Sequence, residues 1–165
     1  MPPLSCNKGG IYNMNDYEIR RAQIKDWPTL LSVFDKSLRS IEEYEAHSED
    51  DYSKLYQCLM NHSFPLYDIY TYVVNDEILG FICYYEHKIE MLYVLPQHMN
   101  KGIGSTLLQY ILDNYHETLE IGVAKGNPVS MHIYKKYGFV VTRDEDYDVS
   151  GIYSPHYIMV REYKG

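Results

Sequence analysis

"LYVLPQHMNKGIGSTLLQYI", residues 92–111, joins a strand to a helix through a loop that carries two glycines. The strand includes Leu92 and Val94 and ends at a proline, and apolar residues at helical spacing follow the glycines. Because Gly102 and Gly104 have no Cβ atom, backbone N–H groups at this point can come very close to a ligand. The first N–H groups of a helix lack internal partners and carry a partial positive charge. The stretch therefore predicts either a binding loop for an anion such as a phosphate or a plain turn.

Two other phosphate-binding motifs fit this loop poorly. A Walker loop needs a lysine directly after its last glycine, whereas Gly104 is followed by Ser105. A dinucleotide-binding loop needs a third glycine where the chain has Leu107. The sequence therefore disfavours a nucleotide triphosphatase and a dinucleotide oxidoreductase.

Hydrophobic periodicity predicts the elements of one domain. Strands are expected at 17–22, at two segments of 69–87 that meet at Asn75-Asp76, and at 88–96, 118–125, 139–147 and 156–163. Helices are expected at 26–38, 48–62, 103–115 and 127–138. The order β-α-α-β-β-β-α-β-α-β-β predicts a single mixed α/β domain over residues 17–165. Residues 1–16 are expected to form a loose leader.

Polar residues at the expected helix starts predict the N-caps. Asp26 precedes one helix, and Asn127 precedes another with Pro128 at its first position. Ser48 and Asp51 have the spacing of a capping box.

The composition of the chain limits the classes of partner that we expect it to bind. The net charge of −8, from 15 basic and 23 acidic residues, disfavours nucleic acids and anionic membranes, and no apolar run approaches the ~18 residues of a membrane span. The three cysteines lie far apart, so a disulfide framework is not expected and a reducing cytoplasm is the expected location. The scattered histidines predict no metal site. A monomer or a homodimer is expected.

A second segment, "GNPVSMHIYKKYGFVV" at 126–141, carries further motif residues. Together the two segments resemble the GCN5-related N-acetyltransferase (GNAT) superfamily, in which L-x-V-x-P and Q/R-x-x-G-x-G/A precede N-x-x-A-x-x-x-Y-x-K-x-G-F. The matching residues are Leu92, Val94, Pro96, Gly102, Gly104, Asn127, Tyr134, Lys136, Gly138 and Phe139. Met99 departs from the pattern because it stands at the Gln/Arg position and has no donor for a phosphate. Lys101 or His98 is expected to compensate.

The resemblance implies a fold and an activity. The fold is a three-layer α/β arrangement in which about four helices flank a central, mixed, mostly antiparallel twisted sheet of about seven strands. The activity is transfer of an acetyl group from acetyl-CoA to a primary amine of a small molecule or peptide, by direct attack in a ternary complex. A non-catalytic acyl-CoA-binding or regulatory module on the same fold is the alternative that Met99 keeps open. A polyamine, an aminoglycoside, an amino acid, a protein N-terminus and a lysine all remain candidate acceptors.

The resemblance also implies where acetyl-CoA binds. Strands 88–95 and 118–124 are expected to separate, and the cofactor is expected to enter the gap between them. An N–H group near Tyr93 or Val94 is expected to polarise the thioester carbonyl. The expected cofactor-binding residues are Leu92, Tyr93, Val94, Met99, Asn100, Lys101, Gly102, Ile103, Gly104, Ser105, Asn127 and Tyr134.

Two residues are expected to carry the chemistry. Tyr134 is implied to protonate the leaving thiolate, with core packing as the alternative role. Glu90 is expected to act as the general base through a water, with a solvent-facing carboxylate as the alternative role, and Glu86 and His87 are weaker candidates. The acidic residues between 42 and 51 either attract a cationic acceptor or form a solvated face. The expected walls of the acceptor pocket are Tyr84, Tyr85 and Tyr153.

Overall fold

The computed structural model describes residues 16–40, 48–149 and 152–165 of the chain. Within these ranges seven strands form one sheet with the order β1-β2-β3-β4-β5-β7-β6. The strands are β1 (Glu18–Arg21), β2 (Asp68–Val74), β3 (Glu77–Tyr85), β4 (Lys88–Val94), β5 (Leu119–Ala124), β6 (Val140–Val149) and β7 (Ile152–Arg161). The helices are α1 (Trp27–Ser40), α2 (Glu49–Cys58), α3 (Ile103–Asn114) and α4 (Pro128–Lys136). Short helical turns are η1 (Ile24–Asp26), η2 (Leu59–Ser63) and η3 (Pro96–His98).

The order of the elements is the predicted one. Only β4 and β5 pair in parallel among the strands of the described sheet, and the other neighbours are antiparallel. The expected mixed, mostly antiparallel sheet with flanking helices is therefore confirmed. Of the expected leader, only Asp16 lies within the described residues.

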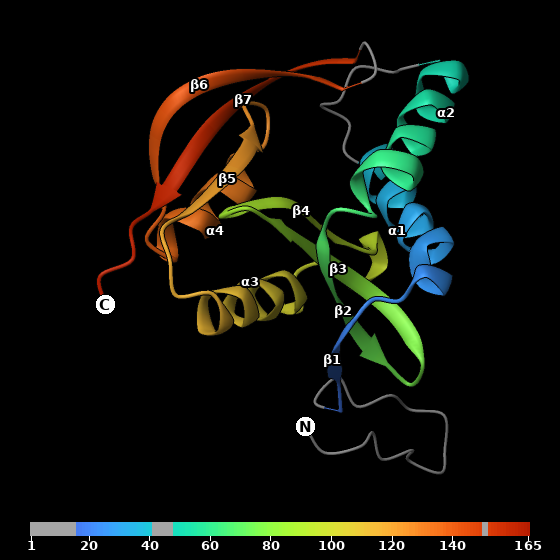
Figure 1. Cartoon of the computed structure of the whole chain (residues 1–165), viewed down its shortest axis with the longest axis horizontal. Helices are drawn as coiled ribbons and strands as arrows, with labels where there is room; N and C mark the ends of the chain where they lie inside the picture. Colours follow the sequence, from blue (N-terminus) through green and yellow to red (C-terminus); the bar gives the residue numbers. More distant parts are fainter. Residues whose placement is uncertain (1–15, 41–47, 150–151) are drawn as a thin grey trace.

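The helices cover the two faces of the sheet in pairs (Figure 1). On one face, Phe34 of α1 packs edge-on against Tyr93 of β4, with ring centroids 4.9 Å apart. On the other face, Tyr110 of α3 packs against Tyr70 of β2 at 4.9 Å. The central strands are therefore sandwiched between α1 and α3, as the layered fold requires.

Strand β3 shows how the sequence produces this sandwich. Its residues from Ile78 to Tyr84 are all buried, although strands with one solvated face alternate buried and exposed positions. A strand covered on both faces needs an unbroken apolar run, and "ILGFICYY" supplies it. Gly80 lies where β3, β4 and α3 approach most closely, because a Cβ there would be 2.9 Å from the carbonyl oxygen of Tyr93.

The two hairpins that connect β2, β3 and β4 use tight turns of left-handed residues. Asn75 and Asp76 have φ angles of 51° and 63°, which confirms the predicted turn between β2 and β3. Glu86 and His87 repeat this geometry between β3 and β4, with φ angles of 42° and 59°. The strand that carries the site is thus held in a fixed register from its first residue.

The expected helix starts are mostly confirmed. Ser48 and Asp51 form the predicted capping box of α2. Asn127 caps α4 by accepting a hydrogen bond from the Ser130 N–H at 3.1 Å. The predicted capping role of Asp26 is wrong, because its carboxylate accepts from the N–H of Gln23, at the preceding turn, at 2.8 Å and from the Arg20 guanidinium at 2.8 and 3.2 Å.

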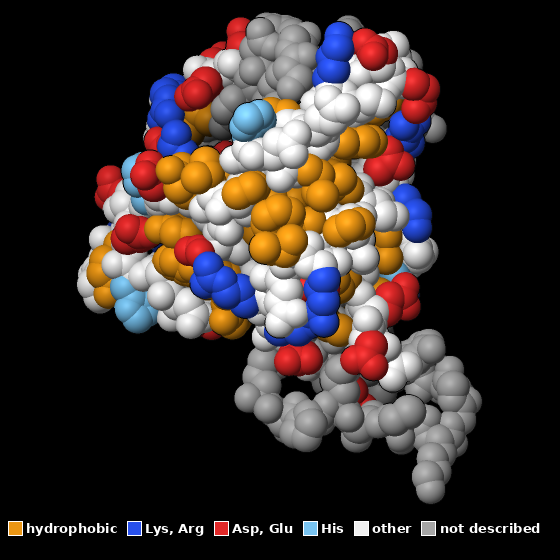
Figure 2. Space-filling view, turned by 45° about the vertical axis from the view of Figure 1, so that its right-hand side comes forward, with side chains coloured by type: hydrophobic (Ala, Val, Ile, Leu, Met, Phe, Trp, Pro, Cys, Tyr) orange, Lys and Arg blue, Asp and Glu red, His pale blue; other side chains and the backbone are white. Residues whose placement is uncertain are grey.

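The surface mixes apolar and charged areas. Figure 2 shows hydrophobic side chains gathered in the middle of one face, with basic and acidic side chains towards its margins. Across the described ranges, every helix is too short or too polar to cross a lipid bilayer.

Candidate active site

Strands β4 and β5 pair over a very short distance and then part. Their register joins Lys88 to Glu120 and Ile89 to Ile121 only. Beyond these pairs, β4 continues beside β3 as far as Val94, while β5 continues beside β7 (Figure 1). The expected separation of the two strands is confirmed, and it leaves one edge of β4 open in the middle of the sheet.

The register of β4 identifies which backbone groups point into this gap. The N–H of Leu95 donates to the carbonyl of Leu79 at 2.8 Å, around the Gly80–Val94 pair. Gly80 and Val94 are therefore a non-hydrogen-bonded pair of the antiparallel ladder, so the N–H and C=O of Val94 point away from β3. Backbone groups alternate in direction along a strand, so the N–H and C=O of Leu92 also point away from β3. The N–H of Tyr93 points towards β3, so Val94 is the better of the two expected thioester contacts.

A β-bulge brings Glu90 to the start of the gap. Tyr84 of β3 pairs with Ile89, and Cys83 pairs with Met91. Glu90 therefore has no pairing partner on β3. Its side chain is exposed and forms no hydrogen bond or ion pair within the described part of the chain.

The surroundings of Glu90 raise its pKa above the ordinary value of 4.5. The largest cause of the raised pKa is partial desolvation by the protein atoms around the carboxylate, although the residue as a whole is exposed. The ammonium of Lys88 opposes this rise in pKa, whereas the negative charges of Glu120 and Glu145 add to it. A carboxylate with a raised pKa and no internal partner is a suitable proton acceptor.

The loop before α3 uses two left-handed residues. Asn100 has a φ of 62°, and Gly102, the N-cap residue, has a φ of 81°. The N–H of Thr106 makes the first bond of the helix, to the carbonyl of Gly102 at 3.0 Å. The N–H groups of residues 103–105 precede this bond and therefore have no acceptor inside the helix.

Gly104 distinguishes the two roles proposed for this loop. A turn explains Gly102, because its φ favours glycine. It does not explain Gly104, which lies inside the first turn of α3. A Cβ at Gly104 would meet only the Cγ2 of Val94, at an ordinary 3.8 Å. The fold therefore has room for a side chain at this position, and the glycine favours close approach by a ligand.

The Gln/Arg position of the family pattern has polar neighbours. Met99 is 38% exposed beside the loop and offers no donor. The Nδ1 atom of His98 is buried, and it has no hydrogen-bond partner among the residues that the structure describes. The ammonium of Lys101 is exposed. These two side chains are the available substitutes for the missing donor.

Helix α4 holds the second motif. Tyr134 is 7% exposed, and its ring centroid lies 6.2 Å from that of Phe139. Gly138, with a φ of 91°, ends the helix as predicted, and Arg161 of β7 donates to the Tyr137 carbonyl at 2.9 Å. The burial of Tyr134 fits both the packing role and the catalytic role.

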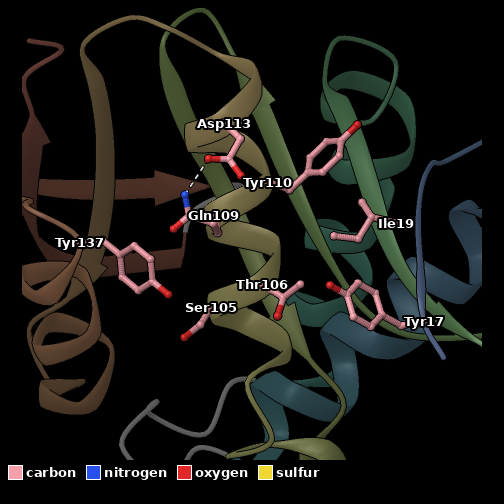
Figure 3. Close-up of a pocket in the computed structure, with 8 residues that line it drawn as sticks. All are labelled: Tyr17, Ile19, Ser105, Thr106, Gln109, Tyr110, Asp113 and Tyr137. Atoms are coloured by element: carbon pink, nitrogen blue, oxygen red, sulfur yellow. Dashed lines mark hydrogen bonds between the residues drawn. The ribbon is translucent and has the colours of Figure 1, made fainter. Parts of the chain in front are cut away.

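A shallow groove of about 410 Å³ runs over the outer side of α3 (Figure 3). Its lining residues are Tyr17, Ile19, Ser105, Thr106, Gln109, Tyr110, Asp113 and Tyr137. The hydroxyl of Tyr137 points towards Ser105, across the space between α4 and α3, while Tyr17 lies on the other side of the helix. Only Ser105 belongs to the residues expected from the sequence, because the other positions carry no motif.

Several residues expected near the acceptor lie elsewhere or outside the description. Tyr84 packs against Tyr115 on the α3 face, with ring centroids 3.9 Å apart. The Tyr153 side chain and residues 42, 43 and 45 are outside the described part. Glu49 accepts two bonds from Arg39, at 2.9 and 3.2 Å, and Asp50 pairs with a lysine of the same helix. These two acidic residues favour the solvated-face interpretation.

Residues that could ligate a metal ion do not cluster anywhere in the described ranges.

Comparison with known proteins gives a consistent family. A model of the Acetyltransferase (GNAT) family matches residues 24–139. The uncharacterized N-acetyltransferase YafP of Escherichia coli is 21% identical over 148 residues, which cover 88% of this chain and 96% of YafP. The solution structure of E. coli YjaB has a TM-score of 0.72 at 23% identity and covers 90% and 98% of the two chains. PaiA N-acetyltransferase of Thermoplasma acidophilum, solved with coenzyme A, has a TM-score of 0.67 at 24% identity, with 89% and 99% covered. This chain therefore belongs to the GNAT acetyltransferase family and is an N-acetyltransferase.

Proposed function

We propose that this enzyme transfers an acetyl group from acetyl-CoA to a primary amine by direct attack in a ternary complex. The observation that carries the proposal is the open edge of β4, where the N–H groups of Leu92 and Val94 face the gap. The family supports acetyl transfer, and the PaiA relative was solved with coenzyme A in its structure.

The donor would be held by backbone groups along two elements. Leu92 offers its N–H group to an amide of pantetheine, as a sheet edge does to an added strand, and Val94 keeps its N–H for the thioester. The carbonyl of Val94 is already engaged by Ser37, so the contacts at Val94 would use its N–H. Residues 103–105 at the start of α3 would surround the pyrophosphate, with Lys101 and His98 beside them.

The N–H of Val94 would polarise the thioester carbonyl. A backbone donor aimed at a developing oxyanion contributes roughly 3 kcal/mol to the stabilisation of a transition state. Its position is set by the β3 ladder and by Ser37, so no reorganisation is needed during the reaction.

Proton transfer would involve Glu90 and Tyr134. Glu90 would accept the proton of the attacking ammonium through a water, and the free amine would then attack the thioester carbon. The carbon–sulfur bond breaks as the new carbon–nitrogen bond is completed, and the thiolate takes the proton of the Tyr134 hydroxyl. The nitrogen then loses its second proton, which passes through water to the Tyr134 oxygen and restores the neutral phenol.

An acyl-enzyme route through a cysteine is disfavoured. Cys83 is fully buried, and burial raises the pKa of its thiol well above the ordinary value. The thiolate is the nucleophilic form of cysteine, so this side chain is a poor nucleophile. Cys58 and Cys83 are both free thiols, in keeping with the reducing cytoplasm that we propose as the location.

A non-catalytic acyl-CoA-binding module is the second candidate, and Met99 is the observation that favours it. Incubation of the full chain with acetyl-CoA and a panel of amines separates the two. We expect amine-dependent release of free thiol, together with an acetylated product of matching mass. Tight binding of acetyl-CoA without thiol release from any amine would favour the module.

A further inference from the structure

Two tyrosines pack against each other near the start of β4, and the charge of Glu90 acts on one of them, Tyr67. Tyr85 pairs with Lys88 at the start of β4. The ring of Tyr67 lies 6.0 Å from the ring of Tyr85 and is tilted by 42°. Both side chains are half-buried, so each ring keeps one part accessible.

The turn after α2 fixes the position of Tyr67. The helix continues into the π-helical turn η2, and the Tyr67 N–H donates to the carbonyl of Ser63 at 3.2 Å. Burial raises the pKa of Tyr67 to about 12, and the charge of Glu90 adds to this rise. The hydroxyl therefore stays protonated at neutral pH and lies within the electrostatic reach of the Glu90 carboxylate.

The charges around Glu90 leave a local negative potential. Arg143 bonds to Glu120 at 3.0 Å and to Glu145 at 3.1 Å, while Lys88 lies 4.0 Å from Glu120. Three carboxylates thus face two cations, and Glu90 itself forms no ion pair in the described ranges, although Lys88 offsets part of its charge. Such a site attracts an ammonium and repels a carboxylate on the same molecule.

We propose that Tyr67 and Tyr85 form, with Glu90, an acceptor subsite that selects a primary ammonium on an alkyl chain without a neighbouring carboxylate. The Tyr67 oxygen accepts one ammonium N–H, and the two rings cover the alkyl chain and the cation. The subsite therefore prefers alkyl diamines, amino-acid amides and lysine side chains to free amino acids. This inference rests on the proposed function, because it assigns the amine of that reaction.

The test is a calorimetric titration of the full chain saturated with coenzyme A, with 1,5-diaminopentane and 2,6-diaminopimelate as probes. The two molecules differ only by a carboxylate beside each ammonium. We expect at least about tenfold tighter binding of 1,5-diaminopentane, because a like charge beside Glu90 is costly. Tyr67→Phe should weaken binding of 1,5-diaminopentane roughly tenfold or more, the scale for a hydrogen bond to a charged group.

A matched control is Tyr163→Phe, since Tyr163 is 46% exposed and packs on His116, away from Glu90. This variant should bind both amines as the wild type does. Thermal unfolding of Tyr67→Phe at the wild-type midpoint would show that the variant keeps the fold. Equal binding of 2,6-diaminopimelate, no binding of 1,5-diaminopentane, or unchanged affinity for 1,5-diaminopentane in Tyr67→Phe would each overturn the proposal. Failure of coenzyme A to bind would instead count against the proposed donor, and the amines are then titrated against the free chain.

Discussion

The hydroxyl of Ser37, in the last turn of α1, donates a 2.6 Å hydrogen bond to the carbonyl of Val94, the last residue of β4. Ser37 is 1% exposed, so its hydroxyl cannot turn to water instead. The bond ties the helix on one face of the sheet to the strand edge that faces the gap. It thereby helps to fix the residue whose N–H is proposed to contact the thioester.

Ser37→Ala should destabilise the fold and weaken donor binding together. The Val94 carbonyl would lose its partner in a half-buried position, at a cost of about 1–3 kcal/mol in the free energy of unfolding. Chemical denaturation and a titration with acetyl-CoA would measure the two effects. Ser32→Ala is the control, because Ser32 lies on the exposed side of α1. Equal stability of the two variants would show that the bond does not hold the strand.

Gly104→Asp should abolish the binding of acetyl-CoA while the fold persists. The site has room for a Cβ, with only Val94 at 3.8 Å, but a carboxylate there would oppose the phosphates. We expect an affinity loss of about 10²-fold or more with little change in the unfolding midpoint. Gly104→Ala, which adds volume without charge, separates the two causes. Retained binding in the aspartate variant would mean that the loop is only a turn.

Tyr134→Phe should reduce turnover ~10²-fold or more and leave acetyl-CoA affinity within a few-fold, because it removes the proton donor but keeps the ring. Steady-state rates and direct titration of the cofactor would measure the two quantities. Tyr163→Phe, at an exposed ring that packs on His116, is the control and should be nearly unchanged. Turnover by Tyr134→Phe at the wild-type rate would leave Tyr134 with its packing role alone.

Glu90 should produce an acid limb in the pH profile of kcat/KM. A general base works when deprotonated, so activity falls as the pH drops through its pKa. Desolvation, with repulsion from Glu120 and Glu145, raises this pKa, so the limb should have its midpoint above 4.5.

Glu90→Gln should remove that limb and lower kcat/KM by roughly 10²-fold or more. The same amine is used for both proteins, so that its own ionisation cancels. Glu86→Gln, in the turn before β4, provides the control. An unaltered acid limb in Glu90→Gln would exclude this carboxylate as the base.

The motif-bearing half of the chain was predictable because local rules decide its conformation. Asn75-Asp76, the glycine loop and the Asn127-Pro128 helix start are all specified by a few neighbouring residues. Asp26 shows the limit of such rules. Its partners are Arg20 and Gln23, and a tertiary ion pair with a strand residue cannot be read from a capping pattern.

The acceptor side depended on contacts between distant segments. The bulge at Glu90 arises from the pairing of β4 with β3, and alternation along β4 alone does not reveal it. Tyr85 was expected at the acceptor pocket, whereas Tyr67 follows a π-helical turn and meets Tyr85 only in the folded sheet, so Tyr67 carried no local signal. Strand β7 begins at Ile152 and not at residue 156, because its first residues pair with the end of β6 in a hairpin that local alternation does not reveal.

The most direct measurement is a calorimetric titration of the full chain with acetyl-CoA, with NAD as the control ligand. The open edge of β4 and the first turn of α3 predict micromolar binding of acetyl-CoA and no binding of NAD. Absence of acetyl-CoA binding, or equal binding of both ligands, would contradict the central claim that these two elements form the donor site.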